Sequence, residues 1–381
     1  MKMKGMQIPA NRSRAPREKM KLMLLATLSK SRFMHTLLAI LLVFWFRNIA
    51  KLRGIVQTDD SDILGPSLKT ELERKREREG GSNSFERRKP EPGRRVFVNF
   101  AFCHTGLDRL ENLKFFLDHG VTNPIPRESN GLVIEYGLVV NGECNDDVCR
   151  ERSLVRNNDN ETIPIRYIQQ NNTGFDFGQH TAMLEELDQM NKSYDAYIFL
   201  NAGVTGPFIP SYMPSGWHWV NAFIDKLTGD VGVVGTCIVC LPRKDEGGYG
   251  PKVEAFAFAM TQKSLNIVRK YGTSFRQHKN KKRAILDGEY ALSKTIFEHN
   301  MTIDSLQMAY KNVKWNSKMS CNNLKHPSRL GSYFGTEVHP LETIFHKNKW
   351  GGKPDVMPEA KLKTYKEFVY GAHRPSIDAN N

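Results

Sequence analysis

Residues 96–118 read VFVNFAFCHTGLDRLENLKFFLD, and this stretch predicts the fold class. Its first part, Val96–Phe102, is an almost continuous apolar and aromatic run, which is typical of a strand buried on both faces. From Leu107 to Asp118 the apolar residues recur at helical spacing, so an amphipathic helix is expected after the strand. A strand that leads into a helix is the repeating unit of α/β folds.

The same alternation continues along the chain. Further strands are predicted at 132–140, 163–168, 197–200, 231–235 and 256–260, with a helix at about 179–190. Strands and helices that alternate in this way predict a mostly parallel sheet covered by helices on both faces. Ligands of such sheets bind at the carboxyl ends of the strands, so the loops 171–178 and 201–208 are the candidate binding loops.

The N-terminal region predicts a membrane anchor. The chain has 381 residues and a formal net charge of +14, and nine of its Lys and Arg residues precede Phe33 against a single acid, Glu18. Residues 33–46 carry no charge, and extension to Ala50 gives a transmembrane signal-anchor at 33–50. The basic flank favours a cytosolic tail at 1–32 and a type II, single-pass topology. The alternative is a cleaved signal peptide, but no small-x-small cleavage motif follows Phe46.

Beyond the anchor, composition divides the chain into further regions. Residues 51–94 are charged and poor in large apolar side chains, which predicts a stalk. We expect the catalytic domain at 95–350 and a C-terminal tail at 351–381. All six cysteines lie beyond the anchor, as expected for an oxidising lumen, and we interpret them as cystines or buried thiols. N-glycosylation triplets begin at Asn160, Asn171, Asn191 and Asn300.

The segment 172–180, NTGFDFGQH, is a glycine-rich turn that holds one carboxylate, Asp176, near the expected helix start. Asp176 has two interpretations, and the sequence leaves both open. It could cap the helix through its side chain. Alternatively, it could accept hydrogen bonds from a ligand hydroxyl or base N–H at the sheet edge.

The residues Asn172–Gly178, followed by YDAYIFLNAGVTGPF at 194–208, resemble the rhamnan-synthesis F family and its eukaryotic relatives. Further matching pieces lie at 231–236, 256–260, 287–293 and 339–347, so the resemblance covers roughly residues 95–350. It implies a GT-A-like fold, in which a Rossmann-like, mostly parallel sheet binds a nucleotide sugar. The implied activity is that of a glycosyltransferase, moving a hexosyl or deoxyhexosyl group.

The resemblance also implies how the donor is bound. The nucleotide sugar would lie across the two loops, and a divalent ion, Mn²⁺ or Mg²⁺, usually binds an Asp-x-Asp motif after the fourth strand. Here that position reads LNAG at 200–203, so metal dependence stays open. Without a metal, basic residues must neutralise the diphosphate. The donor-binding candidates are Asn172, Gly174, Asp176, Asn201, Gly203, His339 and Lys347, and Lys252, Arg283 and His346 are further basic candidates.

An inverting transfer needs a carboxylate base. The resemblance places it at Glu289, just before an expected apolar helix at 290–297, with Asp287 as the reserve candidate. The alternative for Glu289 is a charge that complements the N-terminus of that helix. Trp217 and Trp219 are candidates for stacking on an acceptor sugar, and their alternative is core packing.

Together these features predict a Golgi-lumenal glycosyltransferase that transfers a sugar to a glycan or glycoprotein acceptor. The short apolar span favours an early secretory membrane. The alternative is a non-catalytic relative that binds glycans or scaffolds other enzymes. Nucleic acid is not an expected partner, because most of the excess positive charge lies in the cytosolic tail.

Overall fold

The computed structural model describes residues 93–103, 105–125, 131–150, 155–156, 162–214, 217–245, 248, 250–347 and 359–371. The predicted cytosolic tail and anchor, almost all of the predicted stalk, and most of the predicted C-terminal tail lie outside these residues. Among the residues described, no helix has both the length and the apolar character that a membrane crossing requires.

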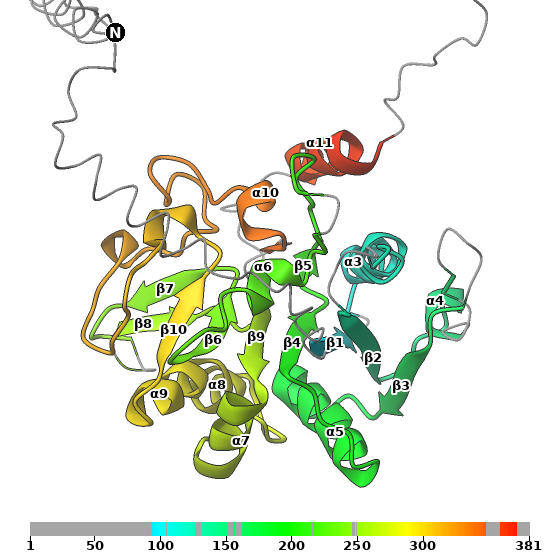
Figure 1. The fold of residues 1–381 in the computed structure, drawn as a ribbon, viewed down its shortest axis with the longest axis horizontal. Helices are drawn as coiled ribbons and strands as arrows, with labels where there is room; N and C mark the ends of the chain where they lie inside the picture. Colours follow the sequence, from blue (N-terminus) through cyan, green and yellow to red (C-terminus); the bar gives the residue numbers. More distant parts are fainter. Residues whose placement is uncertain are drawn as a thin grey trace, which may run out of the picture. The chain divides into compact units, whose positions relative to one another are not determined.

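A seven-stranded sheet organises this part of the chain, in the order β10-β6-β9-β4-β1-β2-β3 (Figure 1). Strand β9 pairs antiparallel with both of its neighbours, β4 and β6, and the other pairs are parallel. The predicted α/β class with a mostly parallel sheet is therefore confirmed. The strands are β1 (Arg95–Cys103), β2 (Val133–Asn141), β3 (Ile165–Gln170), β4 (Ala196–Asn201), β6 (Val231–Gly235), β9 (Ala257–Thr261) and β10 (Thr302–Ser305).

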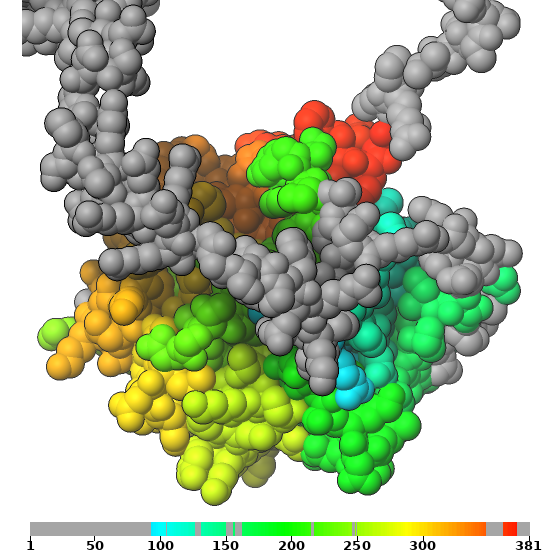
Figure 2. Space-filling model, in the orientation of Figure 1, coloured from blue at the N-terminus to red at the C-terminus, as the bar shows by residue number. Residues whose placement is uncertain are grey.

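Helices cover both faces of the sheet. Successive side chains of β1 point to opposite faces, which explains why its sequence is apolar throughout. Val98 and Phe100 pack in a core with α3 (Leu107–Phe116). Phe97 points to the opposite core, which includes residues of α5 (Phe175–Gln189), α7 (Gln262–Tyr271) and α9 (Ala291–Glu298). Because successive strand residues face opposite sides, both sets must be apolar. Helices α5 and α7 occupy adjacent parts of the molecular surface (Figure 2).

Shorter elements complete the fold. Two small sheets pair β5 (Val204–Thr205) with β11 (His346–Lys347) and β7 (Ile238–Leu241) with β8 (Gly250–Val253). The remaining helical elements are η1 (Leu117–Val121), α4 (Asp147–Arg150), α6 (Asn221–Ile224), α8 (Lys281–Arg283), η3 (Ala284–Tyr290), η4 (Met308–Tyr310), η5 (Asn322–Leu324), α10 (Pro340–Thr343) and α11 (Glu359–Tyr370).

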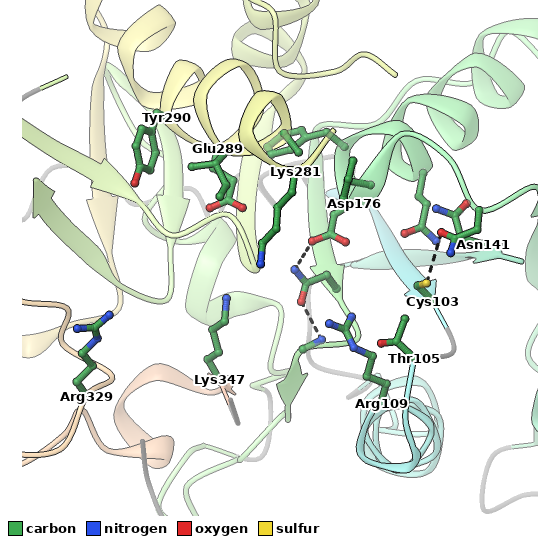
Figure 3. Close-up of a pocket in the computed structure, with 18 residues that line it drawn as sticks. Cys103, Thr105, Arg109, Asn141, Asp176, Lys281, Glu289, Tyr290, Arg329 and Lys347 are labelled. Carbon is green, nitrogen blue, oxygen red and sulfur yellow. Dashed lines mark hydrogen bonds between the residues drawn. The ribbon is translucent and has the colours of Figure 1, made fainter. Parts of the chain in front are cut away.

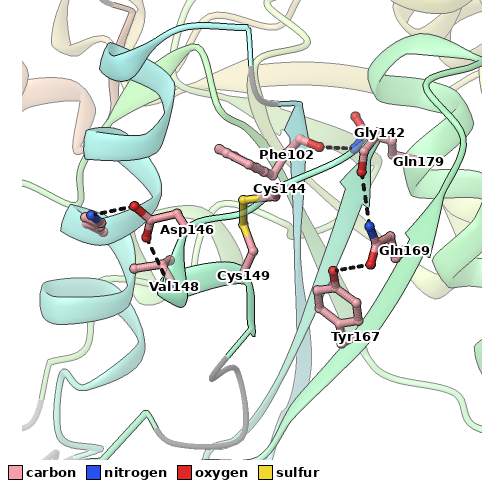
Figure 4. Close-up of a disulfide and its surroundings, with 10 residues drawn as sticks. Phe102, Gly142, Cys144, Asp146, Val148, Cys149, Tyr167, Gln169 and Gln179 are labelled. Carbon is pink, nitrogen blue, oxygen red and sulfur yellow. Dashed lines mark hydrogen bonds and ion pairs between the residues drawn. A yellow bond between two sulfur atoms is a disulfide. The ribbon is translucent and has the colours of Figure 1, made fainter.

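Four of the six cysteines form disulfides, in agreement with the interpretation that the cysteines are cystines or buried thiols. Cys144 and Cys149 form a bridge just after β2 (Figure 4). Cys240 of β7 is joined to Cys321, which is distant in sequence. Cys237 is a buried free thiol, and Cys103 is a partly buried one.

Two predicted helix boundaries are wrong. The helix expected from about 179 begins at Phe175, because Gly174 adopts a left-handed φ of 78° and turns the chain directly into α5. Helical structure was also expected to start at Tyr290, but α8, η3 and α9 run without interruption from Lys281 to Glu298. Glu289 therefore lies inside a helical segment, and the interpretation that it complements a helix N-terminus is wrong.

Candidate active site

A cavity of about 670 Å³ lies at the carboxyl ends of β1, β2 and β4, the edge where the sequence predicts ligand-binding loops (Figure 3). One side, which we call the neutral wall, follows the strand ends. The opposite side, which we call the charged wall, comes from α8, from η3 and from the region beyond residue 320. The neutral wall consists of Cys103, Thr105, Asn141 and Asn172, and the charged wall consists of Lys281, Glu289, Arg329 and Lys347.

Asp176 and Asn201 form a pair between the two walls. Asp176 lies in the first turn of α5, whose N-cap position is Gly174 and has no side-chain capping bond. The Asp176 carboxylate instead accepts a hydrogen bond of 2.6 Å from the Asn201 side-chain amide. The capping interpretation of Asp176 is therefore wrong, and its side chain faces the end of β4.

The Asn201 amide is hydrogen-bonded at both ends, and this bears on metal binding. Its Oδ1 accepts a 2.9 Å hydrogen bond from the backbone N–H of Gly203. This bond fixes the orientation of the amide, with its NH₂ group towards Asp176. Gly203 offers no side-chain ligand, and the described residues contain no group of three or more His, Cys, Asp or Glu arranged to hold a metal ion. The residues at this strand end do not fit an Asp-x-Asp-type metal site.

Close packing brings Glu289 to the same cavity. A Cβ atom at Gly288 would lie 2.9 Å from the Phe177 ring and 3.1 Å from His278, so the glycine lets η3 approach α5. Glu289 is partly exposed and lines the cavity with Asp176. Burial raises the pKa of Glu289 to about 7, with opposing effects from nearby charges: Lys347 and Lys281 lower it, whereas Glu254 and Asp176 raise it. A carboxyl group that titrates near neutral pH is suited to general-base catalysis.

Hydrogen bonds between residues distant in the sequence hold the neutral wall in shape. The Asn141 amide donates to the Thr173 carbonyl at 3.0 Å, and the Cys103 thiol donates to the Asn172 side-chain oxygen at 3.6 Å. Burial raises the pKa of Cys103, against the lowering effect of Arg109, so the thiol stays protonated at neutral pH. This wall offers uncharged donors and acceptors to a ligand.

Lys347 reaches the cavity through strand pairing. β11 pairs antiparallel with β5, which follows the Asn201 loop, so Lys347 lies opposite Val204. The Lys347 ammonium lies 5.1 Å from the centre of the Phe256 ring. Among the basic residues that the sequence nominated, Lys347 is the one that lines the cavity; Arg109, Lys281 and Arg329 were missed. No spacing or periodicity relates these three residues, because they come from separate elements.

The other nominated basic residues have local roles elsewhere. His339 accepts a hydrogen bond from the Leu341 N–H at the start of α10, and His346 is buried in β11. Lys252 is also buried and donates to the Gly248 carbonyl at 2.8 Å. Arg283 forms a 3.2 Å ion pair with Asp287.

Two further nominated residues do not line this cavity. Gly174 borders a second cavity of about 390 Å³ with Gln277 and His278. Asp287, the reserve base, is paired with Arg283 and does not line either cavity.

The predicted acceptor role of Trp219 is wrong, because its ring is buried, whereas that of Trp217 stays a prediction. Trp219 is fully buried, and its indole N–H donates to the Gly120 carbonyl at 2.9 Å. Trp217 is partly buried and packs against the same core. Neither lines the cavity, and the core-packing alternative describes Trp219.

No protein-family model matches the chain, and no curated protein matches it in sequence. Among solved structures, the glycosyltransferase GlyE of Streptococcus pneumoniae TIGR4 aligns with 72% of this chain at 11% identity and a TM-score of 0.34. This chain covers 60% of that structure. Mouse xyloside xylosyltransferase 1 aligns at 11% identity over 69% of this chain and 100% of its own, with a TM-score of 0.34.

A nucleoside-diphosphate-sugar pyrophosphorylase of Vibrio cholerae RC9 aligns at 10% identity over 55% of this chain and 90% of its own, with a TM-score of 0.32. Similarities this low do not establish a shared fold or activity. Function is therefore inferred from the cavity itself.

Proposed function

We propose that the chain is a glycosyltransferase that moves a sugar from a nucleotide-sugar donor to a hydroxyl group of a glycan or glycoprotein acceptor. The observation that carries this proposal is the placement of Glu289, whose pKa is about 7, in a cavity that also contains basic residues at the carboxyl edge of the sheet. A base that titrates near neutral pH and a cationic site for a leaving group are the two components that sugar transfer requires.

In this mechanism Glu289 is the general base. Its carboxylate takes the proton of the acceptor hydroxyl while the acceptor oxygen forms a bond to the anomeric carbon of the donor sugar. The bond between that carbon and the phosphate oxygen breaks, and the nucleoside diphosphate leaves with the bonding electron pair. The transfer would invert the anomeric configuration, because one carboxylate acts as a base rather than as a nucleophile.

The rest of the cavity suits the donor. The uncharged groups of the neutral wall match the hydrogen-bonding edges of a base or ribose. Asp176 is an acceptor-only group when ionised, and Asn201 holds it towards the cavity at 2.6 Å. It is therefore suited to a donor hydroxyl, on the ribose or on the sugar. The reaction would take place between the two walls.

The proposal extends to family and location. The mostly parallel sheet, with a ligand cavity at its carboxyl edge, is consistent with a GT-A-like fold and with the resemblance to the rhamnan-synthesis F family. A Golgi-lumenal, type II location is supported by the basic N-terminal sequence before the uncharged segment 33–46 and by the two disulfides, which form in oxidising compartments.

A donor panel tests this function. The full chain is incubated with a set of nucleotide sugars and a mixed glycan acceptor, and release of nucleoside diphosphate is measured with EDTA and with manganese chloride. We expect release from one class of donor, faster with acceptor than without it. A chain that binds glycans but releases nucleotide from no donor would instead be the non-catalytic binding or scaffolding protein.

A further inference from the structure

We infer that four basic side chains, rather than a divalent cation, hold the diphosphate of the donor. We call Arg109, Lys281, Arg329 and Lys347 the cationic clamp. All four line the cavity that contains Glu289. The inference rests on the proposed function, because it assigns a role to side chains within the same site.

The clamp converges from separate parts of the chain. Arg109 comes from α3, Lys281 from α8 and Lys347 from β11. Figure 3 shows Lys281 and Lys347, both of the charged wall, reaching into the cavity from opposite directions, with Arg109 extending from α3. These side chains come from elements that are far apart in the sequence. Tertiary folding therefore brings them into one cavity, and no local sequence pattern predicts this site.

Charge balance identifies the ligand as an anion. The cavity lining contains four basic side chains and two carboxylates, Asp176 and Glu289. The pKa of Glu289 is about 7, so near neutral pH part of its negative charge is absent. The surplus of positive charge matches a diphosphate, and Lys and Arg bind phosphate oxygens through charge-assisted hydrogen bonds.

A buried carboxylate allows these cations to lie near one another before the ligand binds. Glu254 is only 8% exposed, and its Oε1 lies 2.7 Å from His326 Nε2. Burial by itself would raise the pKa of Glu254, but His326, Lys347 and Arg329 together lower it below its usual value. Glu254 is therefore ionised at neutral pH, and its charge offsets the repulsion between Lys347 and Arg329.

The strand end that would hold a metal in an Asp-x-Asp enzyme lacks the ligands for it. The Asn201 NH₂ group faces Asp176 and its oxygen already accepts from the N–H of Gly203, so at most one lone pair of this amide remains for a cation. An amide also brings no negative charge, which a hard divalent cation needs. The clamp supplies the positive charge that the metal would otherwise supply.

Inorganic pyrophosphate is the probe that tests the clamp, because it contains the anion without a base or sugar. Its binding to the full chain is measured by titration calorimetry in EDTA, and thermal melting verifies that each variant is folded. We expect binding in EDTA, weakened by about tenfold to a hundredfold in Lys281→Met and in Lys347→Met. Arg283→Met is the matched control, since Arg283 is exposed, lies on the same helical segment as Lys281 and does not line the cavity.

Three outcomes would overturn the inference. These are binding that appears only when manganese chloride replaces EDTA, no binding in either buffer, and equal binding by the parent chain, Lys281→Met and Lys347→Met. None of them decides whether sugar is transferred, which the donor panel measures separately. Conversely, metal-free pyrophosphate binding that both variants weaken, together with an inactive donor panel, would keep the anion site and remove the proposed transferase.

Discussion

The two walls of the cavity differ in chemistry and in origin. The neutral wall carries a thiol, a hydroxyl and amides at consecutive strand ends, whereas the charged wall gathers three cations and one carboxyl group from η3, α8 and the region beyond residue 320. Uncharged groups discriminate hydrogen-bonding patterns, and charged groups move protons and stabilise leaving groups. The difference indicates that donor recognition and catalysis are carried by different parts of the chain, so substitutions in the two walls should have separable effects.

The largest effect is expected at the base. Glu289→Gln keeps the shape of the side chain and removes its ability to accept a proton, so kcat for transfer should fall by about 10² to 10⁴. The KM for the nucleotide sugar should change little. Steady-state kinetics with the donor found by the panel provides the measurement. Asp287→Asn is the control, because Asp287 lies two positions away and outside the cavity; it should stay within about twofold of the parent chain. Full turnover by Glu289→Gln would remove the base from the mechanism.

The two disulfides should stabilise the walls unequally. Cys240–Cys321 joins residues 81 positions apart, and Cys321 precedes Arg329 of the charged wall in the sequence, whereas Cys144–Cys149 spans 5 positions and follows β2, which ends at Asn141 of the neutral wall. A longer loop loses more entropy when it is closed in the unfolded chain. Replacing both cysteines of a pair by Ser should lower the free energy of unfolding by about 4 kcal/mol for the first bridge and by about 2 kcal/mol for the second. Denaturant unfolding measures both, and an equal or larger loss from the short bridge would contradict this ranking.

Glu289 should also reduce stability at high pH. Its pKa rises from the usual 4.5 to about 7 in the fold, so ionisation is harder in the folded chain than in the unfolded one. Its contribution to stability is therefore full below pH 4.5 and is lost as the pH rises through 7. Glu289→Gln should be more stable than the parent chain by up to about 2 kcal/mol at pH 8, with a smaller difference at pH 4. A difference that grew towards low pH would have the wrong sign for this carboxyl group.

The smallest effect is expected on the neutral wall. Asn172→Ala removes one amide that we assign to donor recognition, so the KM of the nucleotide sugar should rise by about fivefold to tenfold with kcat unchanged. Gln169→Ala is the matched control, since Gln169 is an exposed amide on β3 that does not line the cavity. A drop in kcat with no change in KM would show that the two walls do not divide the work as proposed.

The same contrast explains how far the sequence could predict the structure. The neutral wall follows strands with clear apolar runs, so Asn172 and Asn201 could be placed at the sheet edge from the pattern alone. The antiparallel direction of β9 could not be predicted, because an apolar run reads the same in either direction. Gly174 and its left-handed φ moved the start of α5 and turned Asp176 away from a capping role.

The charged wall was harder to predict. Glu289 and Lys347 were nominated through the resemblance, whereas Lys281 and Arg329 carry no local signal and are brought there by tertiary packing. Trp219 failed as an acceptor candidate because aromatic residues serve equally well in cores, and its indole N–H finds its hydrogen-bond partner inside the protein.

The pH dependence of kcat/KM, measured for the parent chain and for Glu289→Gln with the same donor and acceptor, tests the central claim most directly. The base must be ionised to act, so kcat/KM of the parent chain should rise about tenfold per pH unit below pH 7 and level off above it. Glu289→Gln should show a low rate without this rise. A parent profile that is flat between pH 5 and 8, or the same rise in Glu289→Gln, would contradict the assignment of Glu289 as the base for sugar transfer.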